Sequence, residues 1–170
     1  LDGAERLRLL REALAHREQV RQHWRDRAIA SRLLAQALDR EQQASGAEAL
    51  LRQNIETVPM VPEGDRTREG LALRTHRVQA QIDLAWFQLA HGRPAEASQT
   101  ASQALARVPQ RITLSWDHPH RMASEALVWA QLPAGDAAAL RAAWQGYEDS
   151  RQRMARGTRT SLLHEVDRLL

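Results

Sequence analysis

The residues best able to do chemistry are two histidines beside a carboxylate, in the stretch WDHPHR that begins at residue 116. His118 and His120 flank Pro119 and follow Asp117, and such a group could hold a metal ion. Structural zinc sites take four protein ligands, however, and this cluster offers too few. We therefore interpret the stretch as the start of a helix, with Asp117 as its N-cap and Pro119 in its first turn.

The spacing of the other histidines and the absence of two residue types exclude further kinds of metal site and catalytic group. His16 and His23 are two helical turns apart, which is too far to chelate one ion, and HEVDR at His164 lacks the second histidine of the zinc-protease motif. The chain has no cysteine and no lysine, so all 24 basic residues are Arg. This composition excludes disulfides, thiolate ligands and a Schiff-base lysine. We expect no enzyme activity, no cofactor and no metal.

Charge and hydropathy argue against two further classes of protein. The net charge is only +3, because 21 acidic residues are interleaved with the arginines, so no nucleic-acid partner is expected. No apolar run approaches the roughly 20 residues of a membrane span. The all-Arg usage is typical of a high-GC bacterial genome, and the bacterial cytoplasm is favoured over the periplasm. Because the chain begins with Leu1, we expect a piece of a longer protein or a mature fragment.

The spacing of apolar residues in the first third of the chain predicts helices. Residues 4–44 contain no Pro or Gly, and their apolar residues recur three or four apart. This segment is either one long helix or a hairpin that bends near residues 16–23, and average helix lengths favour the hairpin. Ser45 with Glu48 three residues later predicts a capping box, which opens a helix that ends near Val58.

Pro, Gly and capping residues divide the rest of the chain. Helices are expected from about 67 to 91, 94 to 108, 119 to 132, 136 to 155 and 161 to 170, with a longer link over 109–118. The residues that open them are, in chain order, Asp65 or Thr67, Pro94, Pro119, Asp136, and Thr160 or Ser161. No segment shows two-residue alternation, so the predicted fold class is all-α.

One nine-residue stretch occurs twice. LAWFQLAHG, which begins at Leu84, returns 43 residues later as LVWAQLPAG and is identical at five of nine places. After the first copy, Ala97, Ala104 and Pro109 follow Gly92 by 5, 12 and 17 residues. Gly permits a tight turn, small alanines let two helices approach closely, and Pro ends the unit. The pattern indicates a stacked helical repeat.

This arrangement closely resembles a tetratricopeptide repeat, whose periodic pattern has these residue types at these offsets. The resemblance implies an α-solenoid of helix pairs, in which the first helices line a concave groove where extended peptides bind. In the second unit Leu140 and Tyr147 replace the two small residues, as is typical of a terminal repeat. Leu38, Gln42 and Gly46 form a trace of an earlier unit.

The glycines at 46, 92 and 135 are 46 and 43 residues apart, more than the common 34. Together with the Asp-His-Pro element, this spacing is similar to the kinesin-light-chain-like long-repeat type found in bacterial signalling proteins. We expect one domain over residues 1–170. It comprises an N-terminal helix or hairpin (1–44), the first clear repeats (45–109), a degenerate second repeat (110–157) and a capping helix (158–170).

The resemblance implies a non-catalytic scaffold: a protein-interaction or regulatory module of a larger bacterial signalling protein, binding a partner peptide or protein in the groove. One alternative is a ligand-sensing domain coupled to an attached kinase or transcription regulator. Another is homodimerisation through the N-terminal helix, for which exposed Leu7, Leu10 and Leu14 would be the signature. The predicted partner-binding stripe, which otherwise is the solvated side of each helix, comprises Arg74, Arg77, Gln81, Gln88, His120, Ser124 and Gln131.

The tryptophans and one further face complete the expectations. Trp86 and Trp129 occupy equivalent places in the two copies, so we expect core wedges rather than ligand-stacking surfaces. Trp116 is the best candidate for an exposed anchor. Some tetratricopeptide grooves clamp a terminal carboxylate with Lys, Arg and Asn. Here the corresponding face offers Gln79, Asp83 and Trp86, which argues against that mode.

Overall fold

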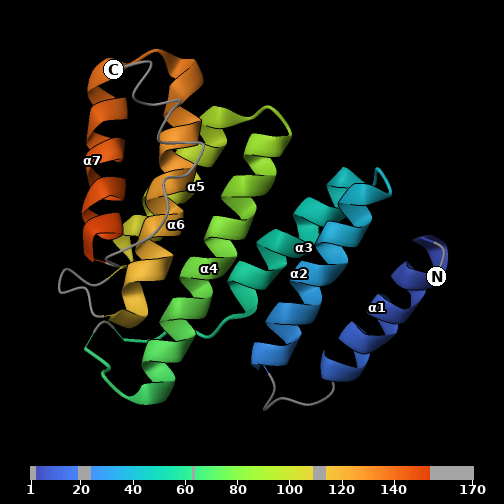
Figure 1. The fold of residues 1–170 in the computed structure, drawn as a ribbon. Helices are drawn as coiled ribbons and strands as arrows, with labels where there is room; N and C mark the ends of the chain where they lie inside the picture. The colour runs from blue at the N-terminus through green and yellow to red at the C-terminus, as the bar shows by residue number, and fades with distance from the viewer. Residues whose placement is uncertain (1–2, 19–23, 63, 109–113, 154–170) are drawn as a thin grey trace. The chain divides into compact units, whose positions relative to one another are not determined.

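The computed structural model describes residues 3–18, 24–62, 64–108 and 114–153. Within these ranges the chain forms α-helices joined by short turns and contains no strand, so the all-α prediction is confirmed (Figure 1). The elements are α1 (Gly3–Glu18), α2 (Trp24–Arg40), α3 (Ala44–Thr57), α4 (Arg68–Ala90), α5 (Pro94–Ala106), α6 (Leu114–Gln131), the 3₁₀ turn η1 (Leu132–Ala134) and α7 (Ala137–Arg153).

The chain divides into two compact units, and the division falls inside α4. In the first unit, residues 1–84, α1 packs on α2 and α2 packs on α3. In the second unit, residues 85–170, α5 packs on α6 and α6 packs on α7. Within each unit these successive helices therefore pack on one another, as the helices of a solenoid do.

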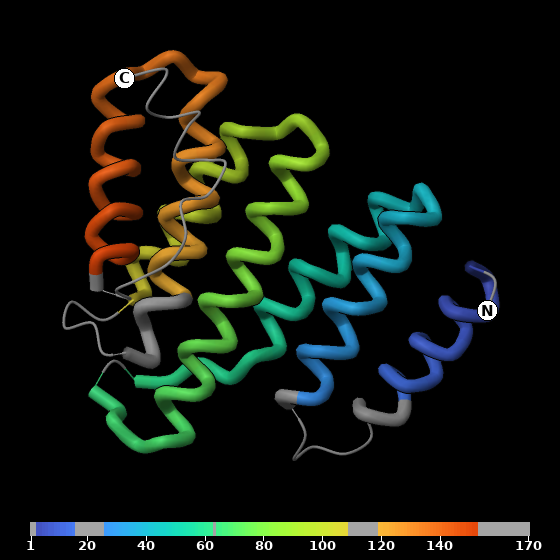
Figure 2. Tube along the Cα trace, in the orientation of Figure 1, coloured from blue at the N-terminus to red at the C-terminus, as the bar shows by residue number. Residues whose placement is uncertain are grey.

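Residues 4–44 form two helices rather than one. Figure 2 traces α1 and α2 as separate helices. Leu7 and Leu14 of α1 are buried, and Leu34 and Leu38 of α2 are buried as well. The hairpin alternative is the one observed. The exposed leucine stripe that would mark a homodimerisation helix is not found at Leu7 and Leu14.

The ends of α3 and α4 test the capping predictions. The capping box at Ser45 is wrong, because α3 begins at Ala44 and its N-cap residue is Gln43. The preceding turn sets this start: the amide of Gln43 donates to the carbonyl of Leu38 at 2.8 Å, which returns the chain to a helix at once. Thr67 is confirmed as the residue that opens α4, since its Oγ1 accepts a hydrogen bond from the amide of Gly70 at 3.0 Å.

The second unit confirms two helix starts and corrects a third. Pro94 lies in the first turn of α5, and Oδ1 of Asp136 accepts hydrogen bonds from the amides of Ala138 and Ala139, as a cap of α7. Pro119 does not open α6, which already begins at Leu114. A proline so near the start of a helix forgoes one hydrogen bond while its fixed φ still suits the helix. The expected cap helix over 158–170 lies outside the described residues.

Two apolar clusters form the core of the second unit. Val128 of α6 packs with Leu140 and Tyr147 of α7, and Trp129 lies partly buried against them. The second cluster joins Ala85, Ala101 and Ala126, which come from α4, α5 and α6, with Trp86 packed at its side. Both tryptophans therefore pack as the wedges that their equivalent positions predicted. The side chain of Trp116 lies outside the part of the structure that can be described.

Candidate interaction surface

A left-handed residue marks each turn within the helix pairs. Among the described residues φ is positive at Gln42 (+59°), Gly92 (+68°) and Gly135 (+68°), which stand between α2 and α3, α4 and α5, and α6 and α7. The trace of an earlier unit was therefore aligned wrongly at Gly46, because this residue lies inside α3. Gln42 is the structural equivalent of the two turn glycines.

Buried residues recur at the same sequence distances from these three turn residues. Eleven places before each of them stands a buried polar residue: Ser31, Gln81 and Ser124. The other repeating buried positions are seven before (Ala35, Ala85, Val128) and five after (Ala47, Ala97, Leu140). The pairs α2–α3, α4–α5 and α6–α7 are therefore built on one plan, in which residues 29–57 supply a pair that the glycine spacing alone did not locate.

Three of the seven residues of the predicted partner-binding stripe lie inside the protein. Gln81, Gln88 and Ser124 are buried, with 2%, 1% and 1% of their surface exposed, so the expectation that they face solvent or a groove is wrong. Oε1 of Gln88 accepts a hydrogen bond from Oγ1 of Thr100 at 2.9 Å. For Gln88, a partner on another helix thus compensates the burial of its amide oxygen.

Two stripe residues of the second unit, His120 and Gln131, contact neighbouring helices. Nε2 of Gln131 donates to Oγ of Ser98 at 2.8 Å, which ties α6 to α5. Nδ1 of His120 contacts Oγ of Ser150 on α7 and lies 3.4 Å from Oγ of Ser124. These contacts hold helices together, and a partner-binding role for these residues stays a prediction.

The two arginines of the stripe hold the link between α3 and α4. Nη2 of Arg74 donates to the carbonyl of Pro62 at 2.7 Å and to the carbonyl of Asp65. Nη1 of Arg77 donates to the carbonyl of Val58 at 2.9 Å. Both side chains thus reach back from α4 to the main chain of the segment that precedes it. Their described contacts are structural.

A different set of first-helix residues faces solvent in the first unit. Ile29 and Leu33 lie one turn apart on α2 and are 41% and 44% exposed, although both are large and apolar. They stand 13 and 9 residues before Gln42, and the same offsets from Gly92 give Gln79 and Asp83 on α4. We call these four residues the α2–α4 face. From the sequence alone, this helix pair was aligned on Gly46 instead of Gln42. For that reason Ile29 and Leu33 were not recognised as the equivalents of Gln79 and Asp83.

Arg32 connects the two helices of this face electrostatically. Partial burial raises the pKa of Asp83 above its ordinary value, while the hydrogen bond from Gln79 and the positive charge of Arg32 act in the opposite direction. Nε2 of Gln79 donates to Oδ1 of Asp83 at 3.1 Å. The charge of Arg32, which lies between Ile29 and Leu33 in the sequence of α2, therefore acts on a carboxylate of α4.

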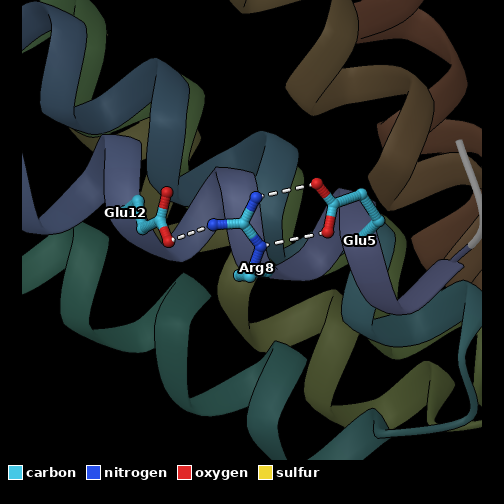
Figure 3. A network of polar contacts seen from close by, with 3 residues as sticks. All are labelled: Glu5, Arg8 and Glu12. Carbon is cyan, nitrogen blue, oxygen red and sulfur yellow. Dashed lines mark hydrogen bonds and ion pairs between the residues drawn. The ribbon is translucent and has the colours of Figure 1, made fainter.

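Several carboxylates elsewhere in the described residues form ion pairs along single helices. Figure 3 shows the pattern on α1, where Arg8 donates to Glu5 at 2.7 Å and to Glu12 at 2.6 Å. The hydrogen bond from Arg8 lowers the pKa of Glu5. Further pairs of this kind are Arg52–Glu48, Arg93–Glu96, Arg121–Glu125 and Arg151–Glu148. Such pairs between residues three or four apart stabilise the helices that carry them.

The described residues show neither a metal site nor a membrane span. In the described part of the chain, no three histidine or acidic residues are grouped so that they could hold a metal ion. No helix there combines the length and the apolar character that crossing a membrane requires. No family model, curated protein or solved structure matches the sequence. The interpretation of the α2–α4 face therefore depends on its residues and their geometry.

Proposed function

We propose that this chain is a non-catalytic protein-interaction module of the tetratricopeptide type, which binds a segment of a partner protein on the first helices of its pairs. The observation that carries the proposal is the repeated plan of three helix pairs with Ile29 and Leu33 left exposed on one of them. Tetratricopeptide arrays bind extended peptides on this side of their helices. The module belongs, in this proposal, to a larger bacterial signalling protein.

The exposed apolar pair supplies the affinity in this proposal. Fully burying an Ile or Leu side chain contributes roughly 1.5–3 kcal/mol, and partial covering contributes less. Two such side chains one turn apart offer a partner a continuous apolar strip about 6 Å long along α2. Single exposed apolar residues are common on proteins, whereas two of them one turn apart on the same helix form a continuous apolar surface.

A peptide-display selection tests this function. A library of random 12-residue peptides on phage is selected on the immobilised chain, and enriched peptides are then measured in solution by fluorescence anisotropy. We expect Leu33→Asp to weaken the best peptide by at least about tenfold, since it replaces an apolar contact with a charge.

Leu9→Asp is the matched control for this experiment. Leu9 lies on α1 and is 41% exposed, so the two substitutions change the same residue type at nearly equal exposure. The control protein should bind like the unchanged chain. Selection of no peptide above the empty support, or equal loss in both variants, would contradict binding on the α2 strip.

A further inference from the structure

We propose that the α2–α4 face recognises a basic, apolar segment: a Lys or Arg of the partner pairs with Asp83 while two apolar side chains cover Ile29 and Leu33. This inference rests on the proposed function and adds the chemistry of the partner. It concerns only residues of the first unit, which the structure describes together.

The carboxylate of Asp83 accepts fewer hydrogen bonds than it could. An ionised carboxylate can accept about four hydrogen bonds. In the described part of the chain Asp83 accepts one, from Gln79, and forms no ion pair. Partial burial also removes water from this carboxylate, which raises its pKa. A partner cation with N–H donors would fill the vacant acceptor positions of this carboxylate and would also compensate for the water that it has lost.

Arg32 is a cation of the chain itself that acts on Asp83. Its charge acts on Asp83 from α2, yet within the described residues no hydrogen bond or ion pair joins the two side chains. Coulombic energy falls with distance, so a partner cation in direct contact with Asp83 gains more than it loses by longer-range repulsion from Arg32. Arg32 therefore does not neutralise the carboxylate through a direct ion pair.

The spacing of Ile29 and Leu33 on α2 suits an extended peptide. Residues four apart on a helix are separated by about 6 Å along its axis. Alternate residues of an extended chain lie about 6.6 Å apart on one side, which nearly matches this separation. An extended segment with apolar residues at alternating positions can therefore cover Ile29 and Leu33 together. In this proposal, a Lys or Arg near these apolar residues pairs with Asp83, on which the charge of Arg32 of α2 also acts.

The same geometry disfavours the opposite kind of ligand. A segment that ends in a free carboxylate, or that carries Asp or Glu beside its apolar residues, would bring a like charge to Asp83 and desolvate both. The predicted preference is thus for a basic segment, in contrast to grooves whose arginines and lysines clamp a terminal carboxylate.

The test uses the random 12-residue peptide selection on the whole chain, with the composition of the enriched peptides as the first readout. We expect peptides that carry apolar residues at alternating positions and at least one Lys or Arg. Asp83→Asn, which keeps the shape of the side chain, should weaken them by about tenfold or more. The affinity for the unchanged chain should fall as salt is added, and this dependence should be smaller for the variant.

Asp149→Asn is the matched control variant. Asp149 on α7 accepts a hydrogen bond from Gln145 at 2.7 Å, with the same four-residue spacing as Gln79 and Asp83, but it is exposed in the second unit. Its affinity for the selected peptides should not change. A charge exchange adds a second check: Asp83→Lys should lose the basic peptides and gain those in which Glu replaces the cation.

The outcomes separate this inference from the proposed function. Peptides that bind the chain and are weakened by Leu33→Asp, but contain no Lys or Arg or bind Asp83→Asn equally well, overturn the inference and leave the proposed function standing. Enrichment of acidic peptides on the α2 strip does the same. A selection that yields no binding peptide overturns the proposed function itself.

Discussion

Replacing Gln42 by Gly should stabilise the protein. Gln42 adopts φ +59° in the turn between α2 and α3, where a residue with a Cβ atom is strained. Its side chain is exposed, so the substitution acts almost entirely through the backbone. The prediction tests whether Gln42, and not Gly46, is the equivalent of the turn glycines at 92 and 135.

The magnitude follows from two opposing terms. A left-handed conformation costs a residue with a Cβ roughly 1–2 kcal/mol. Glycine, in turn, loses about 0.4–1 kcal/mol more conformational freedom on folding. Gln42→Gly should therefore raise the free energy of unfolding by about 0.5–1 kcal/mol. For a chain of this length that corresponds to a rise of roughly 1–4 °C in Tm.

Three companion substitutions give the experiment its contrast. Gly92→Ala and Gly135→Ala should each cost about 0.5–1 kcal/mol, since both have φ +68° and an added Cβ would touch nothing within 4 Å. Gly46→Ala should instead stabilise by about 0.5–1 kcal/mol, because this residue is helical and its Cβ would meet Leu38 at an ordinary 3.7 Å. The four signs together identify the turn residue.

The assay is urea unfolding followed by circular dichroism at 222 nm, with thermal melts as a second measurement. Equal denaturant slopes among the variants would show that the midpoints report stability. A destabilising Gln42→Gly together with a destabilising Gly46→Ala would refute the assignment and return the turn to Gly46. Opposite signs for Gly92→Ala and Gly135→Ala would refute the common plan of the pairs.

Two further predictions concern buried polar groups. Burial raises the pKa of Asp83, so its charge destabilises the folded state above that raised pKa; Asp83→Asn should increase the urea midpoint at pH 7, and the gain should vanish below the ordinary pKa of 3.8. A pH-independent gain would contradict this cause. Thr100→Val removes the donor to the buried Oε1 of Gln88 and should cost about 1–3 kcal/mol in urea unfolding, whereas Thr100→Ser should retain most of the stability.

Helix starts could be predicted where the side chain or the fixed φ of a residue favours the first positions of a helix. Thr67 and Asp136 cap helices through their own side chains, and Pro94 suits only a first turn, so each could be assigned from its neighbours. Ser45 had the same local pattern but failed, because the turn at Gln42 restarts the helix before Ser45 is reached. Pro119 failed because its φ fits the inside of a helix near its start as well as the first residue.

The candidate site was harder to predict because it depends on contacts between distant residues. The sequence shows that Gln88 is polar, but not that Thr100 on another helix pairs with it and allows its burial. A left-handed Gln has no sequence signature comparable to Gly, so the α2 pair was aligned four residues late. That error moved Ile29 and Leu33 out of the positions that correspond to Gln79 and Asp83.

The arginines that hold the link between α3 and α4 have a consequence for how this segment can change. Arg74 and Arg77 bind the carbonyls of Val58, Pro62 and Asp65, and carbonyls are common to every amino acid. The attachment therefore does not depend on most side chains of the link, and Met60 within it is 75% exposed. Substitutions at Met60 can accumulate during evolution, or be introduced for labelling, while α4 still begins at the same residue.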